Sequence, residues 1–395
     1  MMLKIIKIIE VFRGRNMLVI KNGRVHNAID KDAKVMDILV DNGKIVKVEE
    51  NIDEEGTVID ATGLDIYPGF IDAHAHLGLD GYGIGYERQD YNEAGDILSS
   101  QLRAIDAFNP LDPTVKAAAL AGVTCVGTGP GSADVLGGTF IAVKTYGNRV
   151  DDMIVKNPVA MKCAFGENPK RCYRDRGNMS RMTTAANLRS ALYKAKEYLA
   201  KKEAAGDDVF KKPAFDLKME GLIPVIKKEI PLKAHAHTID DMFTAIRIAK
   251  ELDVDLTLEH CTEGHLVADK LVAENYPMAV GPGLTHATKF ELRDITWQTP
   301  GILSKLGGQV SIITDSPVIP QTYLPMCAGL AVKNGMDEFE ALKAITINPA
   351  KHLGIDDKVG SIEVGKDADL VVVSGHPFDL NHEVKYVFID GEEVK

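Results

Sequence analysis

The sequence lacks the features that would mark a membrane-spanning or disulfide-rich protein. No stretch approaches the ~18 to 20 consecutive apolar residues that a membrane span needs. Cysteine is scarce: the chain has five in 395 residues, with no C-x-x-C spacing, which excludes the usual cysteine-based zinc and redox motifs. We therefore expect reduced, buried thiols in a cytoplasmic protein.

Positive charge is also in short supply. Lys and Arg number 46 against 57 Asp and Glu, so the formal net charge is −11. This balance excludes the basic, phosphate-neutralising face of a typical nucleic-acid binder. Hydrophobic residues at 45% and charged residues at 26% are ordinary values for a soluble globular protein. We expect a small-molecule substrate, no nucleic acid and no membrane as partners, and leave open a homo-oligomer.

The first residues do not form a secretory signal. Their short apolar run is interrupted by Lys4, Lys7 and Glu10, and no small-residue cleavage site follows. We expect residues 1–16 to be an N-terminal extension with little structural role, with a short added helix or strand as the alternative.

Both ends of the chain are rich in β-strand signals. Residues 17–66 alternate short β-rich runs with turn signals, and the Asn22-Gly23 and Asn42-Gly43 pairs have the chemistry of hairpin turns. Residues 358–395 repeat this style. Because chain termini often lie close together, we expect these ends to form one composite β-sandwich domain.

The middle of the chain, residues 67–357, alternates strand-like and helix-like segments. This rhythm predicts parallel βα units, and their number favours a TIM (β/α)8 barrel as the α/β catalytic domain, with an open sheet as the alternative. The clearest helix covers residues 239–252, with Thr238 as N-cap and Asp241 completing a capping-box pattern. Its apolar positions fall on one face: Met242, Ala245, Ile246, Ala249 and Leu252.

Two histidine pairs end predicted strands of this barrel. His74 and His76 lie in the string DAHAH after the apolar run YPGFI, and His235 and His237 lie in a second AHAH string. Residues two apart on a strand point to the same face, so each pair projects together. Two imidazoles on one face make half of a metal site. The alternative is a pair of polar surface histidines without a role in binding.

Two further strand ends carry ligand-type residues. His260 closes LTLEH, where we expect Glu259 to point the opposite way, and Asp315 closes SIITD. Imidazole nitrogen and carboxylate oxygen are ligands that zinc and similar metals take in catalytic sites. The spacing therefore predicts a divalent metal at the mouth of the barrel, zinc by expectation, as one or two ions, with iron and manganese as alternatives.

These motifs resemble the amidohydrolase superfamily, within its imidazolonepropionase-related branch, which also holds metal-dependent dipeptidases. The resemblance rests on PGFIDAHAHLG, LEHC, ITDSP and INPAKHLG, followed by GSIEVGKDADLVVV, and it covers residues 17–395. It implies the metal ligands His74, His76, His235, His260 and Asp315. It also implies a substrate-facing position for His237, which we group with His260 and Asp315 as catalytic residues.

Members with two metals bridge them with a carboxylated lysine on the fourth barrel strand. Lys162 in VAMKCAFG is the matching residue by resemblance. A lysine inside an apolar strand is costly unless it is neutralised or paired, which favours a functional role over a snorkelling surface lysine. Glu167 in GENPKR is the rival, because some members use a glutamate there.

The expected reaction is hydrolysis of an amide or peptide-like C–N bond of a small molecule by attack of a metal-bound hydroxide. Such a metal lowers the pKa of bound water to near 7. Asp315 would act as general base and then as general acid toward the leaving amine. The alternatives are an aminohydrolase (deaminase), an imidazolone-type cyclic amide hydrolase, and a non-catalytic scaffold. Deaminating relatives carry a glutamate shortly after the strand-five histidine, and here HTIDDMF follows instead.

Weaker signals concern the loops that follow predicted strands. His286 could face the pocket or lie in a solvated loop, and Arg171 in the segment 167–181 could bind a substrate carboxylate or belong to a charged solvated loop. The Gly-rich run 128–138 lacks the Walker lysine, so we expect a loop beside the site. We treat His352 and the other remaining histidines as structural and peripheral.

Overall fold

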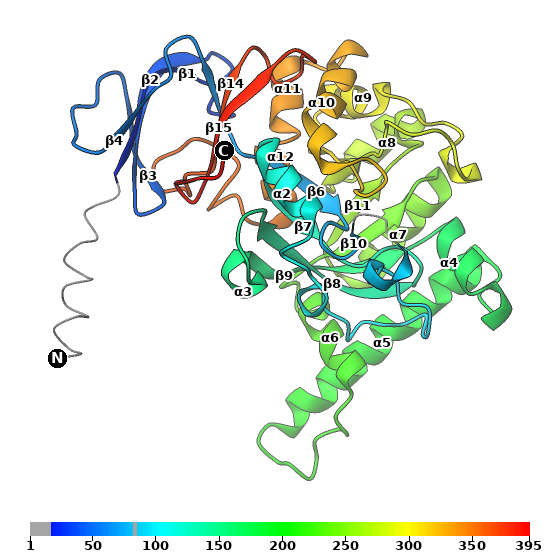
Figure 1. Cartoon of the computed structure of the whole chain (residues 1–395). Coiled ribbons are helices and arrows are strands. Elements are labelled where there is room, and N and C mark those ends of the chain that lie inside the picture. The colour runs from blue at the N-terminus through cyan, green and yellow to red at the C-terminus, as the bar shows by residue number, and fades with distance from the viewer. Residues whose placement is uncertain (1–16, 82–84) are drawn as a thin grey trace, which may run out of the picture.

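The computed structural model describes residues 17–81 and 85–395, which form two eight-stranded sheets, one of them surrounded by helices (Figure 1). The expectation for residues 1–16 lies outside the described residues. One sheet forms a nearly closed barrel from the middle of the chain, and the other is built from both chain ends. The predicted α/β class, with a barrel and a separate β-structure from the chain ends, is thus confirmed.

The strands of the barrel sheet follow one another in chain order. They are β6 (Phe70–Ala75), β7 (Val123–Thr128), β8 (Leu136–Lys144), β9 (Ile154–Ala164), β10 (Leu232–Ala236), β11 (Leu256–His260), β12 (Met278–Val280) and β13 (Val310–Ile312). Neighbours pair in parallel except at β8, which runs antiparallel to both β7 and β9. The barrel therefore departs from the all-parallel pattern at one strand.

The seam between β13 and β6 is held by a buried carboxylate. Asp72 Oδ2 accepts hydrogen bonds from Thr314 N at 3.0 Å, Thr314 Oγ1 at 2.6 Å and Gln321 Nε2 at 2.6 Å. Its Oδ1 accepts the His74 backbone N–H at 3.0 Å. Burial raises the pKa of Asp72 to about 6, against the effect of these donors. Asp72 thus ties β6 to the segment that carries Asp315.

Helices cover the outside of the barrel (Figure 1). They are α2 (Pro113–Leu120), α3 (Val150–Met153), α4 (Glu167–Cys172), α5 (Arg181–Ala205), α6 (Leu217–Ile226), α7 (Ile239–Leu252), α8 (Ala268–Ala273), α9 (Gln298–Lys305), α10 (Leu324–Lys333), α11 (Glu338–Lys343) and α12 (Ile347–Leu353). Short 3-10 turns are η1 (Tyr86–Arg88), η2 (Ala104–Asp106), η3 (Arg174–Arg176), η4 (Gly264–Val267), η5 (Phe290–Leu292) and η6 (Gln321–Tyr323). In the part of the chain that the structure describes, no helix has both the length and the apolar composition that crossing a membrane requires.

The helix predicted over residues 239–252 is confirmed as α7, and its five predicted apolar positions are buried. Thr238 is its N-cap residue, but the predicted capping box does not form. The Thr238 hydroxyl donates to Asp241 Oδ2 at 2.8 Å, while the Ile239 N–H donates to Glu263 Oε2 at 2.8 Å. A carboxylate from a neighbouring loop therefore accepts the hydrogen bond of a free backbone N–H in the first turn of the helix.

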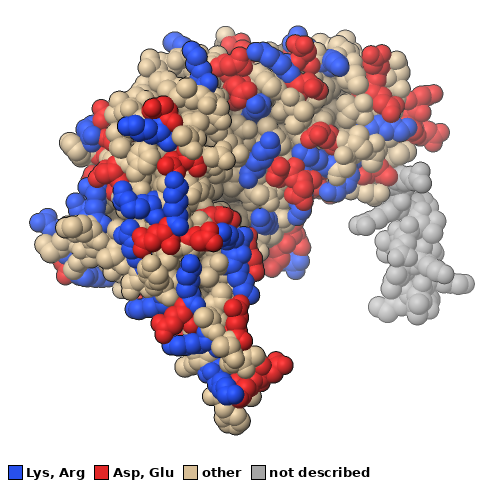
Figure 2. Space-filling model, turned by 180° about the vertical axis from the view of Figure 1, so that it is seen from behind, with Lys and Arg blue, Asp and Glu red and all other residues tan. Residues whose placement is uncertain are grey.

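Helices α5 and α6 and the loop between them extend beyond the barrel as an arm (Figure 1). In this loop the apolar side chains of Val209, Phe210 and Phe215 are exposed. Lys and Arg side chains are interspersed with Asp and Glu along this arm and over the face shown in Figure 2.

The second sheet has the order β16-β15-β14-β5-β1-β2-β3, with β4 beside β1. Its strands are β1 (Leu18–Val25), β2 (Lys34–Asp41), β3 (Lys44–Glu49), β4 (Thr57–Asp60), β5 (Asp65–Pro68), β14 (Leu370–Ser374), β15 (Glu383–Ile389) and β16 (Glu392–Glu393). The two chain ends meet where β14 pairs antiparallel with β5, with Leu370 opposite Pro68.

The two Asn-Gly pairs have different roles in this sheet. Asn42 and Gly43 have positive φ values of 49° and 77° and connect β2 to β3, so this predicted hairpin is confirmed. The hairpin prediction for Asn22-Gly23 is wrong: the pair lies inside β1, at an irregularity of the β1–β2 register. Asn22 N donates to Asp37 Oδ1 at 2.8 Å, so the backbone N–H at the irregularity has a hydrogen-bond partner within the sheet.

A buried ionic cluster joins the two sheets. Lys144, at the end of β8, is buried, and its ammonium lies 2.7 Å from Asp369 Oδ1, 3.1 Å from Asp367 Oδ2 and 3.0 Å from Asp390 Oδ1. Burial acts to lower the pKa of Lys144, but the three carboxylates raise it above its usual value. The cluster fixes the end of a barrel strand to the segments that flank β14 and β15.

Candidate metal centre

His74 and His76 meet the carboxylate of Asp315 at the carboxyl end of the barrel. Asp315 Oδ1 lies 3.6 Å from His74 Nε2 and 3.3 Å from His76 Nε2. Asp315 has a positive φ of 52°, which turns its side chain at the end of the strand. Burial acts to raise the pKa of Asp315, but His260, His76 and His74 hold it well below its usual range. The carboxylate is therefore ionised at neutral pH.

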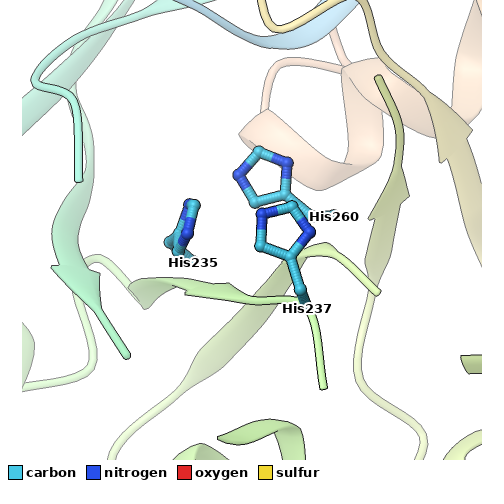
Figure 3. Close-up of side chains that lie close together, drawn as sticks. All are labelled: His235, His237 and His260. Atoms are coloured by element: carbon cyan, nitrogen blue, oxygen red, sulfur yellow. The ribbon is translucent and has the colours of Figure 1, made fainter. Parts of the chain in front are cut away.

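His235, His237 and His260 form a second group beside the first (Figure 3). The ring centroids of His235 and His260 are 4.4 Å apart, and the stacked rings of His237 and His260 are 4.5 Å apart. Burial lowers the pKa of His260 to about 4 and the pKa of His235 and of His237 well below the usual value. These imidazoles are neutral at physiological pH, as metal ligands must be.

The nitrogen atoms of these rings are arranged as a metal requires. His76 Nδ1 lies 2.7 Å from Gly129 O, and His260 Nδ1 lies 2.8 Å from Gly281 O, so each Nδ1 carries the proton and each Nε2 keeps a free lone pair. The buried Nε2 atoms of His235 and His260 have no hydrogen-bond partner within the described part of the chain. Unpartnered buried nitrogens facing one another fit a cation that takes nitrogen and oxygen ligands.

The donor atoms form two groups that share His260. One group holds His235, His237 and His260, the other holds His74, His260 and Asp315, and within each group the donor atoms lie within 4.8 Å of one another. The structure thus brings together all five histidine and aspartate ligands that the resemblance implies, since His76 contacts Asp315 as well.

Lys162 projects from β9 into the same place. It is fully buried, and its Nζ lies 3.0 Å from His74 Nε2. Burial lowers the pKa of Lys162 to about 8, with Asp315 and Glu259 acting in the opposite direction. Its rival Glu167 is half-buried at the start of α4, where its backbone N–H donates to Glu291 Oε2 at 2.8 Å. The geometry favours Lys162 over Glu167.

Comparison with known proteins identifies the family of this chain. A model of the amidohydrolase family matches residues 223–394. The crystal structure of an amidohydrolase from Thermotoga maritima MSB8 is 44% identical, covers 96% of this chain and 99% of that chain, and superposes with a TM-score of 0.93. The chain belongs to the amidohydrolase family.

This amidohydrolase also has curated relatives. The amidohydrolase tasK of Hapsidospora irregularis is 26% identical over 415 residues, which cover 95% of this chain and 42% of that protein. The imidazolonepropionase of Thermoplasma acidophilum is 46% identical over 84 residues, or 21% of this chain and 20% of that protein. The chain thus spans less than half the length of these curated relatives, while the resemblance to the superfamily is confirmed.

Glu259 lies beneath the candidate metal centre of this amidohydrolase, contrary to prediction. His260 has a positive φ of 77°, which breaks the alternation of the strand, so both side chains face the barrel interior. Glu259 Oε2 accepts from His74 Nδ1 at 3.0 Å and from Lys233 Nζ at 2.9 Å, and His352 Nε2 lies 2.9 Å from Oε1. A carboxylate on Nδ1 fixes the tautomer of a ligating histidine.

His352, expected to be peripheral, is therefore a buried part of this network. It comes from α12, which packs against β6 and β13. Lys233 lies on β10, two residues before His235, and Glu259 lies on β11, next to His260. No sequence motif marks Lys233 or Glu259. The signal that could have found them is the charge itself, since Lys233 and Glu259 are charged residues in strands that are buried along their whole length.

A cavity of about 410 Å³ opens above the donor groups. Its lining includes Arg171 and the Gly-rich run at Gly131–Ala133, so the loop expected beside the site is there. His286 is exposed on the neighbouring loop and is absent from this lining among the described residues. Lys289, which the sequence analysis did not single out, lines the cavity together with His76, His235, His237 and Asp315.

Proposed function

We propose that this amidohydrolase is a divalent-metal-dependent hydrolase that cleaves an amide or peptide-like C–N bond of a small molecule. The observation that carries the proposal is the convergence of neutral, buried imidazoles and the ionised Asp315 at the floor of an open cavity. Family membership supports the C–N bond as the target.

The residues that would hold the cation are His74, His76, His235, His260 and Asp315, with Lys162 between the two donor groups. Zinc or a similar ion held there polarises a carbonyl and lowers the pKa of water toward 7. For Lys162, addition of its amine to carbon dioxide, with release of one proton, would give a carbamate. The burial of Lys162 beside His74 Nε2 supports this role, because a carbamate there would offer oxygen ligands to a cation.

Asp315 has the position and the charge of a general base. Its carboxylate borders the cavity and is unprotonated at neutral pH, so it can accept a proton from the attacking water. The protonated Asp315 then returns that proton to the nitrogen that leaves when the C–N bond breaks. His237 belongs to the other donor group and lines the cavity, with Nδ1 2.7 Å from Thr262 Oγ1, so it would face a substrate in that cavity.

The test uses purified protein with metal analysis and a panel of dipeptides, N-acyl amino acids and cyclic ureas. We expect the wild type to contain one or two divalent ions per chain and to hydrolyse at least one class. Asp315→Asn should retain metal and lose about 10²- to 10⁴-fold in kcat. Asp207→Asn, exposed on the arm, serves as the matched control. A near-wild-type rate for Asp315→Asn refutes the role of Asp315, and a wild type that binds no metal refutes the proposal.

A further inference from the structure

The charged lining of the cavity is unbalanced toward positive charge. Arg171 and Lys289 line it, and the carboxylate that lines it with them is Asp315, which faces the metal-ligand histidines. The rest of the lining is polar or apolar, with the amide of Asn168 and the side chains of Leu292 and Val318. A cavity of this composition suits a ligand that has an anionic group.

Lys289 is held in place rather than free in solvent. Its side chain is 17% exposed, its Nζ lies 2.6 Å from Glu291 Oε1, and a longer contact of 3.4 Å joins it to Asn168 Oδ1. An ammonium has three donors, so at least one remains for a ligand after these two contacts. Fixing a lysine costs side-chain entropy, and these contacts restrict the side chain before any ligand arrives.

Glu291 is the anchor of this lysine. Its carboxylate is 2% exposed and also accepts the Glu167 backbone N–H at 2.8 Å. Glu291 Oε1 lies 3.6 Å from His235 Nε2 and 3.7 Å from His237 Nε2, so the ammonium is held next to the donor group. The ammonium of Lys289 therefore lies on the cavity wall, beside the place where the reaction would occur. A cation that binds the substrate requires such a position.

Arg171 supplies a second cation at the exposed side of the same cavity. It comes from the last turn of α4 and makes no ion pair with any residue that the structure describes. A guanidinium without a protein partner can form two parallel hydrogen bonds to a carboxylate.

We infer that Lys289 is a specificity-determining residue that binds a carboxylate of the substrate, with Arg171 as the second contact, so that the enzyme prefers N-acyl or peptide-like amides bearing a carboxylate. This inference rests on the proposed function for its substrate class. The competing role for Lys289 is neutralisation of Glu291 alone, which would leave the enzyme indifferent to a charge on the ligand.

The experiment measures binding, so that it stands whether or not the ligand is hydrolysed. Isothermal titration of the metal-loaded protein compares N-acetyl-L-leucine with its uncharged carboxamide, in the wild type, Lys289→Met and Lys289→Arg. We expect the wild type to bind the acid about 10- to 100-fold more tightly than the amide, the range for one charge-assisted hydrogen-bonded pair. Lys289→Met should lose this preference, and Lys289→Arg should keep part of it.

Lys305→Met removes an exposed lysine on α9 and serves as the matched control, with the preference expected to be unchanged. Equal binding of acid and amide by the wild type, or no binding of either, overturns the inference. A preference that survives in Lys289→Met overturns it as well. Failure of the proposed function has a different signature: the carboxylate preference and its loss in Lys289→Met are seen, but no amide in the panel is hydrolysed.

Discussion

Replacing Lys144 by methionine should destabilise the protein by about 3 to 5 kcal/mol, the cost of removing one partner from a buried ion pair. The substitution keeps the volume of the side chain but leaves Asp369 and Asp367 without their buried cation. Asp369 is almost completely buried, so its charge cannot be hydrated in place. The pair with the half-exposed Asp390 adds about 1 kcal/mol or less.

Equilibrium unfolding in urea, followed by circular dichroism, measures this loss. Lys31→Met is the matched control, because Lys31 pairs with Asp337 at 3.0 Å while both side chains are exposed. That variant should unfold at nearly the same urea concentration as the wild type, because exposed ion pairs contribute little to stability. A second variant, Lys144→Met combined with Asp369→Asn, should recover part of the loss, because the stranded charge is removed together with its partner.

The loss should also depend on pH. Burial raises the pKa of Asp369 even beside Lys144, so without the lysine the native state binds this proton more readily than the unfolded state does. Protonation then favours folding, and the deficit of Lys144→Met should shrink as the pH falls from 7 toward 5. A deficit equal to that of Lys31→Met, or one that grows on acidification, would refute the reasoning.

Two further predictions concern buried carboxylates nearer the site. Glu259→Gln weakens the acceptor of His74 Nδ1 and should lower metal affinity about 10- to 100-fold in competition with a chelator, whereas unchanged affinity would contradict its orienting role. Asp134 accepts a hydrogen bond from Tyr173 at 2.6 Å, and burial raises its pKa to about 7. The native state therefore loses stability as the pH rises from 4 to 7, and Asp134→Asn, which keeps a carbonyl acceptor, should gain melting temperature relative to the wild type at pH 8 but not at pH 4. A difference in melting temperature between Asp134→Asn and the wild type that is the same at pH 4 and pH 8 would contradict this prediction.

The barrel and its ligands could be predicted from the sequence because strand ends carry a local signal. The AHAH strings place their imidazoles by the period of the strand alone, and α7 follows from its helical spacing. Strand β8 gave no such signal: it is buried along its whole length, so it lacks the alternation of a half-exposed strand, and its glycines suggested a loop. The arm formed by α5 and α6 could not be predicted, because the helical period of its apolar residues is weak. On α5 these residues form only a narrow buried stripe, and charged residues of both signs surround it.

The supporting residues of the site could not be predicted from local pattern. Glu259 and His260 both face the interior because the positive φ at His260 breaks the alternation of the strand, a backbone feature that no residue type at that position signals. Lys289 and Glu291 lie in a polar loop where a charged side chain is usually solvated, and only the fold shows that Glu291 is buried beside His235. Hydrogen bonds between residues distant in sequence, such as that from His352 to Glu259, become visible only when the chain is folded.

The pairing of β5 with β14 has a consequence for biosynthesis. The two partners are roughly 300 residues apart, and a ribosome adding about 5 to 20 residues per second needs some 15 to 60 seconds to cover that distance. During this interval one side of β5 remains an uncovered strand edge, which is a site for association with other nascent chains. Cells that produce this protein at high rate should therefore depend on chaperones that shield this edge until translation reaches β14.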